Sequence, residues 1–252
     1  CSDDYPISDD EIKLVGWFMT EGWICKSKGS YYRYMIGQSK KVYPKKCREL
    51  SKIIVSCGLN PNVCHKKNGM MFWQFCKKDN DYFDTLLDSG VHSFPSYFRL
   101  LSYRQMSILF EVLMEGDGNW KSMTYTNKDL SYCQNFSEMC HLLGMGCSIR
   151  EDVQLYKGIL RPLYRCYVLR GTHKRIQNVK LVPYDGRIWC VTVPTGFIVI
   201  RYNNKISITG NCALMCLAAN SEREVEQEME VTDNPLYPGI TSTIGAIRRH
   251  SY

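Results

Sequence analysis

The sequence predicts an α+β fold in which two similar halves are followed by a smaller region of short β-strands. Two repeats predict the halves: a helical segment that begins at Cys47 recurs at Cys133, and an apolar run upstream of each copy recurs as well. The third observation is a change of pattern near Tyr184, where helical periodicity gives way to short strands and turns. With 252 residues, the chain has room for one large domain or two modest ones.

The first repeated segment runs from Cys47 to Gly58 and recurs from Cys133 to Gly144, with a cysteine, a serine and a glycine at matching places. Each copy has apolar residues at helical spacing and ends at a glycine, a pattern that predicts a helix and its stop. A polar, aromatic-rich stretch precedes each copy, and a short β-prone segment follows it. We therefore expect strands near residues 31–39, 70–76, 122–127 and 162–169.

The second repeated segment is a mostly apolar run that ends in a carboxylate and a glycine. It reads LVGWFMTEG up to Gly22 and FEVLMEGDG up to Gly118. A helix that is apolar almost all round must be buried, and its own twin is the natural partner. Gly16 costs about 1 kcal/mol relative to alanine inside a helix, and close approach of the second helix would explain it. We expect adjacent buried helices at residues 11–21 and 109–117.

Both runs place an acid where a cation would be favoured. Glu21 and Asp117 are expected at helix C-termini, the negative end of the helix dipole, where an anion is disfavoured by about 0.3–1 kcal/mol. Two such acids at matching places indicate a compensating cation. Packing of the two helices would bring the carboxylates together beside a basic surface, which is a geometry for paired metal ions acting on two phosphodiesters.

The two nonapeptides resemble the LAGLIDADG motif. Their separation of 96 residues, from Gly22 to Gly118, resembles that of a single-chain homing endonuclease with two motifs. The resemblance covers residues 8–170 and implies two αββαββα halves, about 8–90 and 100–170, within a domain 1–172. Their sheets would form a DNA-binding saddle. It also implies a monomer that cuts a long, asymmetric double-stranded DNA target, with Glu21 and Asp117 binding Mg²⁺.

The charge pattern agrees with a polyanionic partner, although a merely soluble basic surface is the alternative. The formal net charge is +7, and residues 213–252 carry more acids than bases, so the remainder is more basic still. Lysines and arginines alternate with tyrosines, which suits contact with phosphates and bases. By the resemblance, we expect DNA contacts from Lys26, Lys28, Arg33, Tyr34, Gln38 and Lys40 in the first half, and from Lys121, Tyr125, Asn127 and Lys128 in the second.

The sequence departs from the family pattern at three places. Glu21 replaces the usual aspartate, and Val112 stands where the second motif often has a glycine. Family members often carry a lysine three residues before a proline ahead of the second motif, and here His92 precedes Pro95 at that spacing. A histidine there would accept a proton or would weaken cleavage. A DNA-binding domain that no longer cleaves is therefore the alternative function.

From Tyr184 onward, short strands with tight turns are expected, and a small β-sheet closing the domain would explain them alone. The sequence Thr209-Gly-Asn-Cys212 then resembles a C-terminal intein junction. The stretch up to it resembles the last part of a Hint protein-splicing domain, which we assign to residues 173–211. Residues 212–252 would be the host segment, or C-extein. The expected strands are 187–193, 197–201 and 206–209.

In the chemistry that this resemblance implies, the side-chain amide of Asn211 cyclises and breaks the bond before Cys212, whose thiolate has first accepted the upstream acyl group. Cys190 and Thr209 together resemble class three inteins, in which an internal cysteine takes the first acyl group. A buried core thiol is the alternative for Cys190. No N-terminal splicing half is expected in this chain, so that half would be a separate partner. A splicing element with a passenger middle domain is a third alternative.

Composition excludes several classes. No apolar run approaches the roughly 18 residues of a membrane span, and the polar, acidic first residues predict no signal peptide. The thirteen cysteines lack the paired Cys-x-x-Cys spacing of a zinc module. Several lie at apolar helical positions, where reduced buried thiols are expected. We expect a reducing compartment, the cytoplasm of a bacterial, phage-infected or similar host.

Overall fold

The computed structural model describes residues 3–26, 32–156 and 158–169, then residue 183 and residues 188–193, 197–202, 205–210 and 241–245. The chain divides into two compact units, Cys1–Thr172 and His173–Tyr252. The first unit mixes helices with antiparallel sheets, so the predicted α+β class is confirmed. Within the described part of the chain, no helix is long and apolar enough to cross a membrane.

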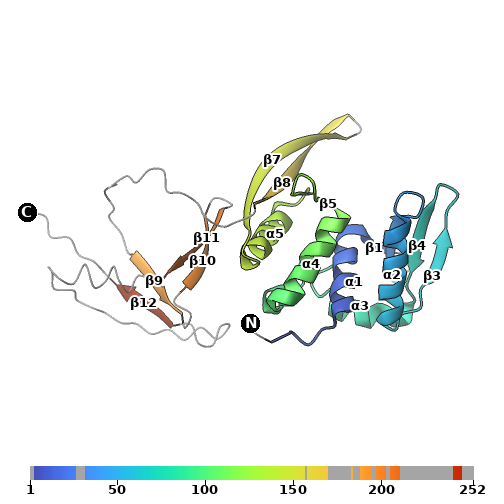
Figure 1. The fold of residues 1–252 in the computed structure, drawn as a ribbon, viewed down its shortest axis with the longest axis horizontal. Helices are drawn as coiled ribbons and strands as arrows, with labels where there is room; N and C mark the ends of the chain where they lie inside the picture. The colour runs from blue at the N-terminus through green and yellow to red at the C-terminus, as the bar shows by residue number, and fades with distance from the viewer. Residues whose placement is uncertain are drawn as a thin grey trace, which may run out of the picture. The chain divides into compact units, whose positions relative to one another are not determined.

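The first half of unit one has the element order αββαββα. A four-stranded antiparallel sheet, in the order β1-β2-β4-β3, is packed against its helices (Figure 1). The strands expected at 31–39 and 70–76 are confirmed as β2 and β4, and β1 and β3 are the two further strands that the αββαββα pattern implied without residue ranges. The elements are α1 (Asp9–Glu21), β1 (Gly22–Lys26), β2 (Tyr32–Ser39), α2 (Pro44–Ser56), β3 (Asn62–His65), β4 (Met70–Gln74), the short η1 (Lys77–Asp79) and α3 (Asn80–Leu86).

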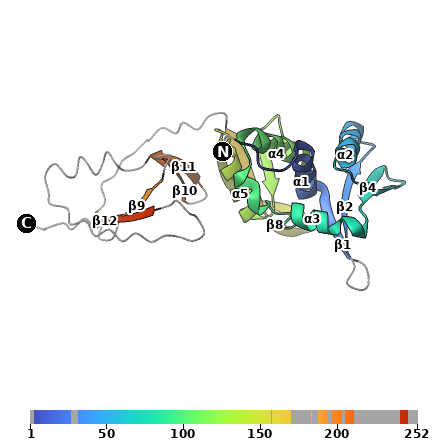
Figure 2. The same cartoon turned by 90° about the horizontal axis from the view of Figure 1, so that it is seen from below.

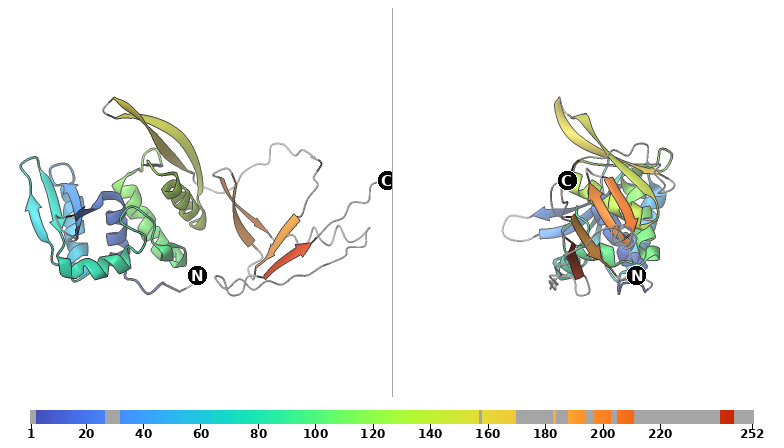
Figure 3. Two further views of the ribbon diagram at one scale, coloured as in Figure 1. Left: turned by 180° about the vertical axis from the view of Figure 1, so that it is seen from behind. Right: turned by 90° about the vertical axis from the view of Figure 1, so that its left-hand side faces the viewer.

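The second half repeats this plan after a short connecting helix. Its sheet has the order β5-β6-β8-β7, which matches that of the first half strand for strand. Strands β7 and β8 are longer than their counterparts and project as a two-stranded ribbon (Figures 1 and 3). A seventh element would fall outside the described residues. The elements are η2 (Ser96–Leu100), α4 (Tyr103–Gly116), β5 (Gly118–Asn119), β6 (Thr124–Asn127), α5 (Leu130–Leu142), β7 (Gly146–Tyr156) and β8 (Ile159–Leu169).

Matching local signals start and stop the paired helices. Capping boxes begin both motif helices, Ser8 with Glu11 at α1 and Ser102 with Gln105 at α4. The predicted glycine stops of α2 and α5 are confirmed, because Gly58 has φ +71° and Gly144 has φ +73°. In both, the glycine N–H and the next N–H bond back to carbonyls of the last helical turn, as in a Schellman motif. The repeat is therefore structural as well as sequential.

The two motif helices, α1 and α4, lie side by side at the centre of unit one (Figures 1 and 2). Their contacts join equivalent positions of the two motifs. A Cβ on Gly16 would lie 2.7 Å from Val112 Cγ1, and a Cβ on Gly116 would lie 2.5 Å from Thr20 Oγ1. Each contact thus pairs a glycine with a β-branched residue, so Val112 fills the space that Gly16 leaves. The predicted close packing of the two helices is confirmed.

The second unit is described only as short paired strands. Antiparallel β10 (Phe197–Tyr202) and β11 (Lys205–Gly210) form one pair, and β9 (Ile188–Thr192) pairs with β12 (Thr241–Gly245). These strands lie at the expected places, but β12 belongs to the segment that we expected to be host protein. The boundary at residue 212 and the Hint assignment therefore stay predictions. Asn211 and Cys212 lie outside the described residues.

Candidate metal and nucleic-acid site

The packed motif helices bring the two predicted acids to the same end of the helix pair. Glu21 is the last residue of α1, and Asp117 immediately follows α4, where its backbone N–H donates to the Leu113 carbonyl at 3.1 Å. Because equivalent positions face each other along the helices, the two carboxylates occupy equivalent places beside the contact between Thr20 and Gly116. The expected convergence of Glu21 and Asp117 is what the structure shows.

The electrostatics of the pair disfavour two negative charges. Burial and the charge of the nearby Glu21 carboxylate together raise the pKa of Asp117 to about 6. Burial also raises the pKa of Glu21, against a hydrogen bond from Gln38 and the charge of Lys46. The Asp117 side chain nevertheless remains open to solvent on one side. The two acids therefore form an accessible concentration of negative charge, which is suited to a cation.

Lys46 of α2 supplies part of the compensating charge and was not among the predicted site residues. Its ammonium donates to the Glu115 carbonyl at the end of α4 and lies 4.7 Å from the centroid of the Tyr43 ring. This positive charge lowers the pKa of both Glu21 and Asp117. Its place beside both acids depends on the packing of α2 against α1, which no local sequence signal reveals.

Gln38 is a correction to the predicted DNA contacts. It is 4% exposed, and its Nε2 donates to Glu21 Oε1 at 3.0 Å while its Oε1 accepts the N–H of Ser39. The reason is strand alternation, because Gln38 follows Tyr34 and Ile36 on the face of β2 that packs against the helices. Gln38 therefore positions a carboxylate and does not project from the outer face of the sheet.

His92 lies beside the end of the first motif helix. Its Nδ1 is 3.3 Å from the Met19 carbonyl, two residues before Glu21. The ring is otherwise exposed. The structure thus brings the predicted histidine to the neighbourhood of the acids, and it shows no direct hydrogen bond from His92 to either of them.

Two further predicted DNA contacts need correction for the same reason as Gln38. Tyr34 is 3% exposed and donates to Asp84 Oδ1, and Tyr125 is fully buried and stacked on Phe136. Asn127 is partly exposed, its side-chain oxygen accepts the N–H of Asp129 at the start of α5, and its contact with DNA stays a prediction. An aromatic or amide residue on a strand suits either face, and only the register decides between them.

The remaining predicted contacts lie at the surface or outside the described residues. Lys28 falls outside the description. Arg33 is half-buried on β2 and alternates with Tyr34, which places it on the outer face. The exposed ones are Lys26, Lys40, Lys121 and Lys128.

The outer face of the second sheet carries polar residues that the sequence did not predict. The register aligns Arg150 of β7 with Arg165 of β8 and Thr126 of β6. Next to this row, the Arg150 guanidinium lies 5.0 Å from the centroid of the Tyr167 ring. Arg165 forms an ion pair with Asp152 at 3.0 Å. These side chains form a cationic, hydrogen-bonding surface of the kind that contacts nucleic acid.

The carboxylates of Glu21 and Asp117 fit Mg²⁺ only if water and substrate phosphates complete its coordination. Among the described residues, no group of three or more histidine, cysteine or acidic side chains is arranged to hold a metal ion by itself. Magnesium is commonly bound by one or two carboxylates together with water and substrate phosphates. Glu21 and Asp117, with an accessible face and raised pKa values, meet that requirement.

Comparison with known proteins gives one related sequence, and no family model matches the chain. A ribonucleoside-diphosphate reductase subunit beta of Aquifex aeolicus (strain VF5) is 26% identical over 184 residues. The match covers 67% of this chain and 25% of that protein. The chain thus spans about a quarter of that relative, and we transfer none of the reductase activity to it.

Several similar solved structures are of homing endonucleases. The I-DmoI complex with DNA and Ca has a TM-score of 0.49 at 17% identity, over 64% of this chain and 82% of that chain. A structure from mesophilic variants of I-DmoI has a TM-score of 0.48 at 18% identity, over 64% and 88%. I-WcaI bound to its DNA recognition sequence has a TM-score of 0.36 at 12% identity, over 63% and 75%. At these values the likeness carries no argument by itself.

Proposed function

We propose that residues 1–172 form a site-specific, metal-dependent endonuclease of double-stranded DNA. The observation that carries the proposal is the convergence of Glu21 and Asp117 at the ends of two motif helices packed through equivalent positions. Two carboxylates held together at a cost to the metal-free protein are expected where a cation is needed for function. The two-motif resemblance of the sequence supports the same class.

Each half contributes one of the two acids. Divalent ions, when bound, would supply a Lewis acid for the scissile phosphates and an activated water. Glu21 and Asp117 would hold those ions, and Gln38 keeps the Glu21 carboxylate in place through its hydrogen bond. Lys46 reduces the repulsion between the acids before a cation arrives. His92, whose ring contacts the Met19 carbonyl, would move a proton at the edge of the site.

The two outer sheet faces would bind the DNA, and their difference implies an asymmetric target. Trp23 and Phe72 are in edge-to-face contact on the first outer face, and Gly37 lies beneath them. The second outer face instead carries the row that contains Arg150 and Arg165. Unlike surfaces contact unlike base sequences, because polar groups read base edges and apolar groups contact thymine methyls.

Cleavage of a DNA library tests this function. We expect the wild-type chain with Mg²⁺ or Mn²⁺ to cut a small set of long, related, asymmetric sites in both strands and to leave short 3′ overhangs. Asp117→Asn should abolish cleavage with little change in DNA affinity, because a metal ligand is lost while the basic surface remains. Binding without cutting by the wild type would support the alternative, a DNA-binding domain that has lost catalysis. Absence of both would refute the proposal.

We also propose that the second unit belongs to a protein-splicing element. The support is the sequence Asn211–Cys212 directly after strand β11, together with Cys190 on β9. A separate N-terminal half would complete the element, Cys190 and Thr209 would serve the first acyl transfer, and Asn211 would cyclise to release Cys212. Incubating the chain with candidate N-terminal halves tests this, because ligation yields a spliced product of predictable mass. If no spliced product forms with any N-terminal half that binds the chain, the alternative holds and Cys190 is a buried core thiol.

A further inference from the structure

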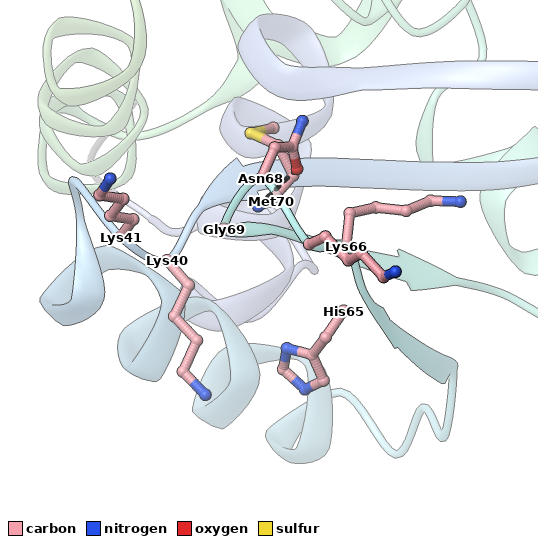
Figure 4. Close-up of a pocket in the computed structure, with 8 residues that line it drawn as sticks. Lys40, Lys41, His65, Lys66, Asn68, Gly69 and Met70 are labelled. Carbon is pink, nitrogen blue, oxygen red and sulfur yellow. Dashed lines mark hydrogen bonds between the residues drawn. The ribbon is translucent and has the colours of Figure 1, made fainter.

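A hollow that is separate from the two acids is lined by four lysines from two loops (Figure 4). Its volume is about 380 Å³, and it lies between the segment after β2 and the turn that joins β3 to β4. The lining contains no acidic residue. The lining residues are Lys40, Lys41, His65, Lys66, Lys67, Asn68, Gly69 and Met70.

The backbone holds the two loops together through Gly69. The N–H groups of Lys40 and Lys41 both donate to the Gly69 carbonyl, at 3.0 and 3.4 Å. Gly69 has φ +85°, and a Cβ there would lie 2.8 Å from Lys41 Cβ. Residues other than glycine rarely adopt this backbone conformation. Within the turn, Gly69 N–H donates to the Lys66 carbonyl, so the lysines are presented by a built framework.

The four positive charges have no counter-charge within the hollow. The ion pairs among the described residues join other side chains, and none of them includes Lys40, Lys41, Lys66 or Lys67. Four ammonium groups that border one hollow repel one another, which costs free energy. A phosphate group would remove that cost, because its oxygens accept charge-assisted hydrogen bonds from lysine.

The hollow lies at the same end of β2 as the proposed metal site. Gln38 contacts Glu21, and Lys40 follows Gln38 by two residues, or about 7 Å along an extended chain. Met70 also lines the hollow, and it alternates with buried Met71 at the start of β4, on the outer face of the sheet. The lysines therefore border the surface that we assign to DNA, near the carboxylates.

We propose that this lysine hollow binds a backbone phosphate of the DNA strand that enters the metal site, within a few nucleotides of the bond to be cut. The inference rests on the proposed endonuclease function and adds to it a fixed point that sets the position of the strand. A free polyphosphate offers the same chemistry, so the test includes inorganic triphosphate as a separate probe.

The salt dependence of DNA binding tests the proposal. The full chain and a Lys66→Gln/Lys67→Gln variant are titrated with a mixed-sequence duplex in Ca²⁺ at several salt concentrations. The slope of log K against log salt is negative, and each phosphate contact that is lost reduces its magnitude by about 0.9. We expect the magnitude of the slope to decrease by about 0.9 from these two substitutions, because the hollow holds one phosphate. A Lys52→Gln/Lys78→Gln control removes the same charge from exposed positions outside the hollow and should change the slope much less.

Gly69→Ala supplies a variant with unchanged charge. It should reduce the magnitude of the slope as the lysine variant does, because the turn that contains Gly69 must move away from Lys41. Equal losses in the lysine variant and the control, with normal wild-type binding, would overturn the hollow and leave the endonuclease proposal intact. Lysine-dependent binding of triphosphate without an effect on the duplex would overturn the DNA assignment. No duplex binding by the wild type would instead refute the proposed function itself.

Discussion

Replacing Asp117 by asparagine should stabilise the metal-free protein at neutral pH. The folded state raises the pKa of this carboxyl from its ordinary value of 3.8 to about 6, through burial and the charge of Glu21. A carboxyl with a raised folded-state pKa binds its proton more tightly in the folded chain. Folding stability therefore falls as the pH rises from about 4 through about 6, and the whole penalty is present above that window.

The size of the effect follows from the shift. About two pKa units at 1.36 kcal/mol each set a ceiling near 3 kcal/mol. Because the side chain is open to solvent on one side, screening reduces this, and we expect a gain of about 1 kcal/mol. The matched control is Glu115→Gln, which removes an exposed carboxylate one turn or less away and should change the free energy of unfolding by less than about 0.5 kcal/mol.

Urea unfolding of the wild type and both variants at about pH 8 and about pH 4, without divalent metal, measures the effect. Asp117→Asn should be more stable than the wild type at the higher pH and nearly equal to it at the lower. Adding Mg²⁺ should narrow the difference at the higher pH, because a bound cation relieves the wild type only. A loss of stability in Asp117→Asn, or a gain that does not depend on pH, would refute the electrostatic account of the site.

Three other predictions test separate parts of the molecule. Gly16→Val should destabilise the chain by about 2 kcal/mol or more, because its side chain meets Val112, and adding Val112→Gly should recover much of the loss in urea unfolding. Gln38→Ala should slow cleavage about tenfold or more and preserve DNA affinity, because Glu21 loses the hydrogen bond that holds its carboxylate in the site. Cys190→Ala, mixed with a complementing N-terminal half, should block N-terminal cleavage while release of the C-terminal segment continues, as mass spectrometry would show.

The features that the sequence predicted are those with local signals. The apolar runs and the glycine stops act within one helix, so α1, α2, α4 and α5 could be anticipated. The convergence of Glu21 and Asp117 followed because a buried helix repeated in one chain needs a partner. Because Glu21 and Asp117 occupy matching positions in the two repeats, the sequence alone predicted that they form a site.

The features that escaped depend on the pairing of distant segments. Tyr34 and Tyr125 suit a DNA-binding face as well as a core, and only the strand register places them against helices. Lys46 reaches the acids because α2 packs against α1. Arg150 and Arg165 form one row because β7 pairs with β8 in this register. Such residues become part of a site only when tertiary packing brings them there.

Manganese binding at the two acids tests the central claim most directly. The chain in complex with a DNA duplex is titrated with Mn²⁺, and bound metal is followed by electron paramagnetic resonance. We expect the wild type to bind Mn²⁺ in competition with Mg²⁺, and Glu21→Gln and Asp117→Asn each to weaken that binding at least tenfold, whereas Glu115→Gln keeps it. Equal Mn²⁺ binding by all four proteins would show that the two carboxylates are not a metal site.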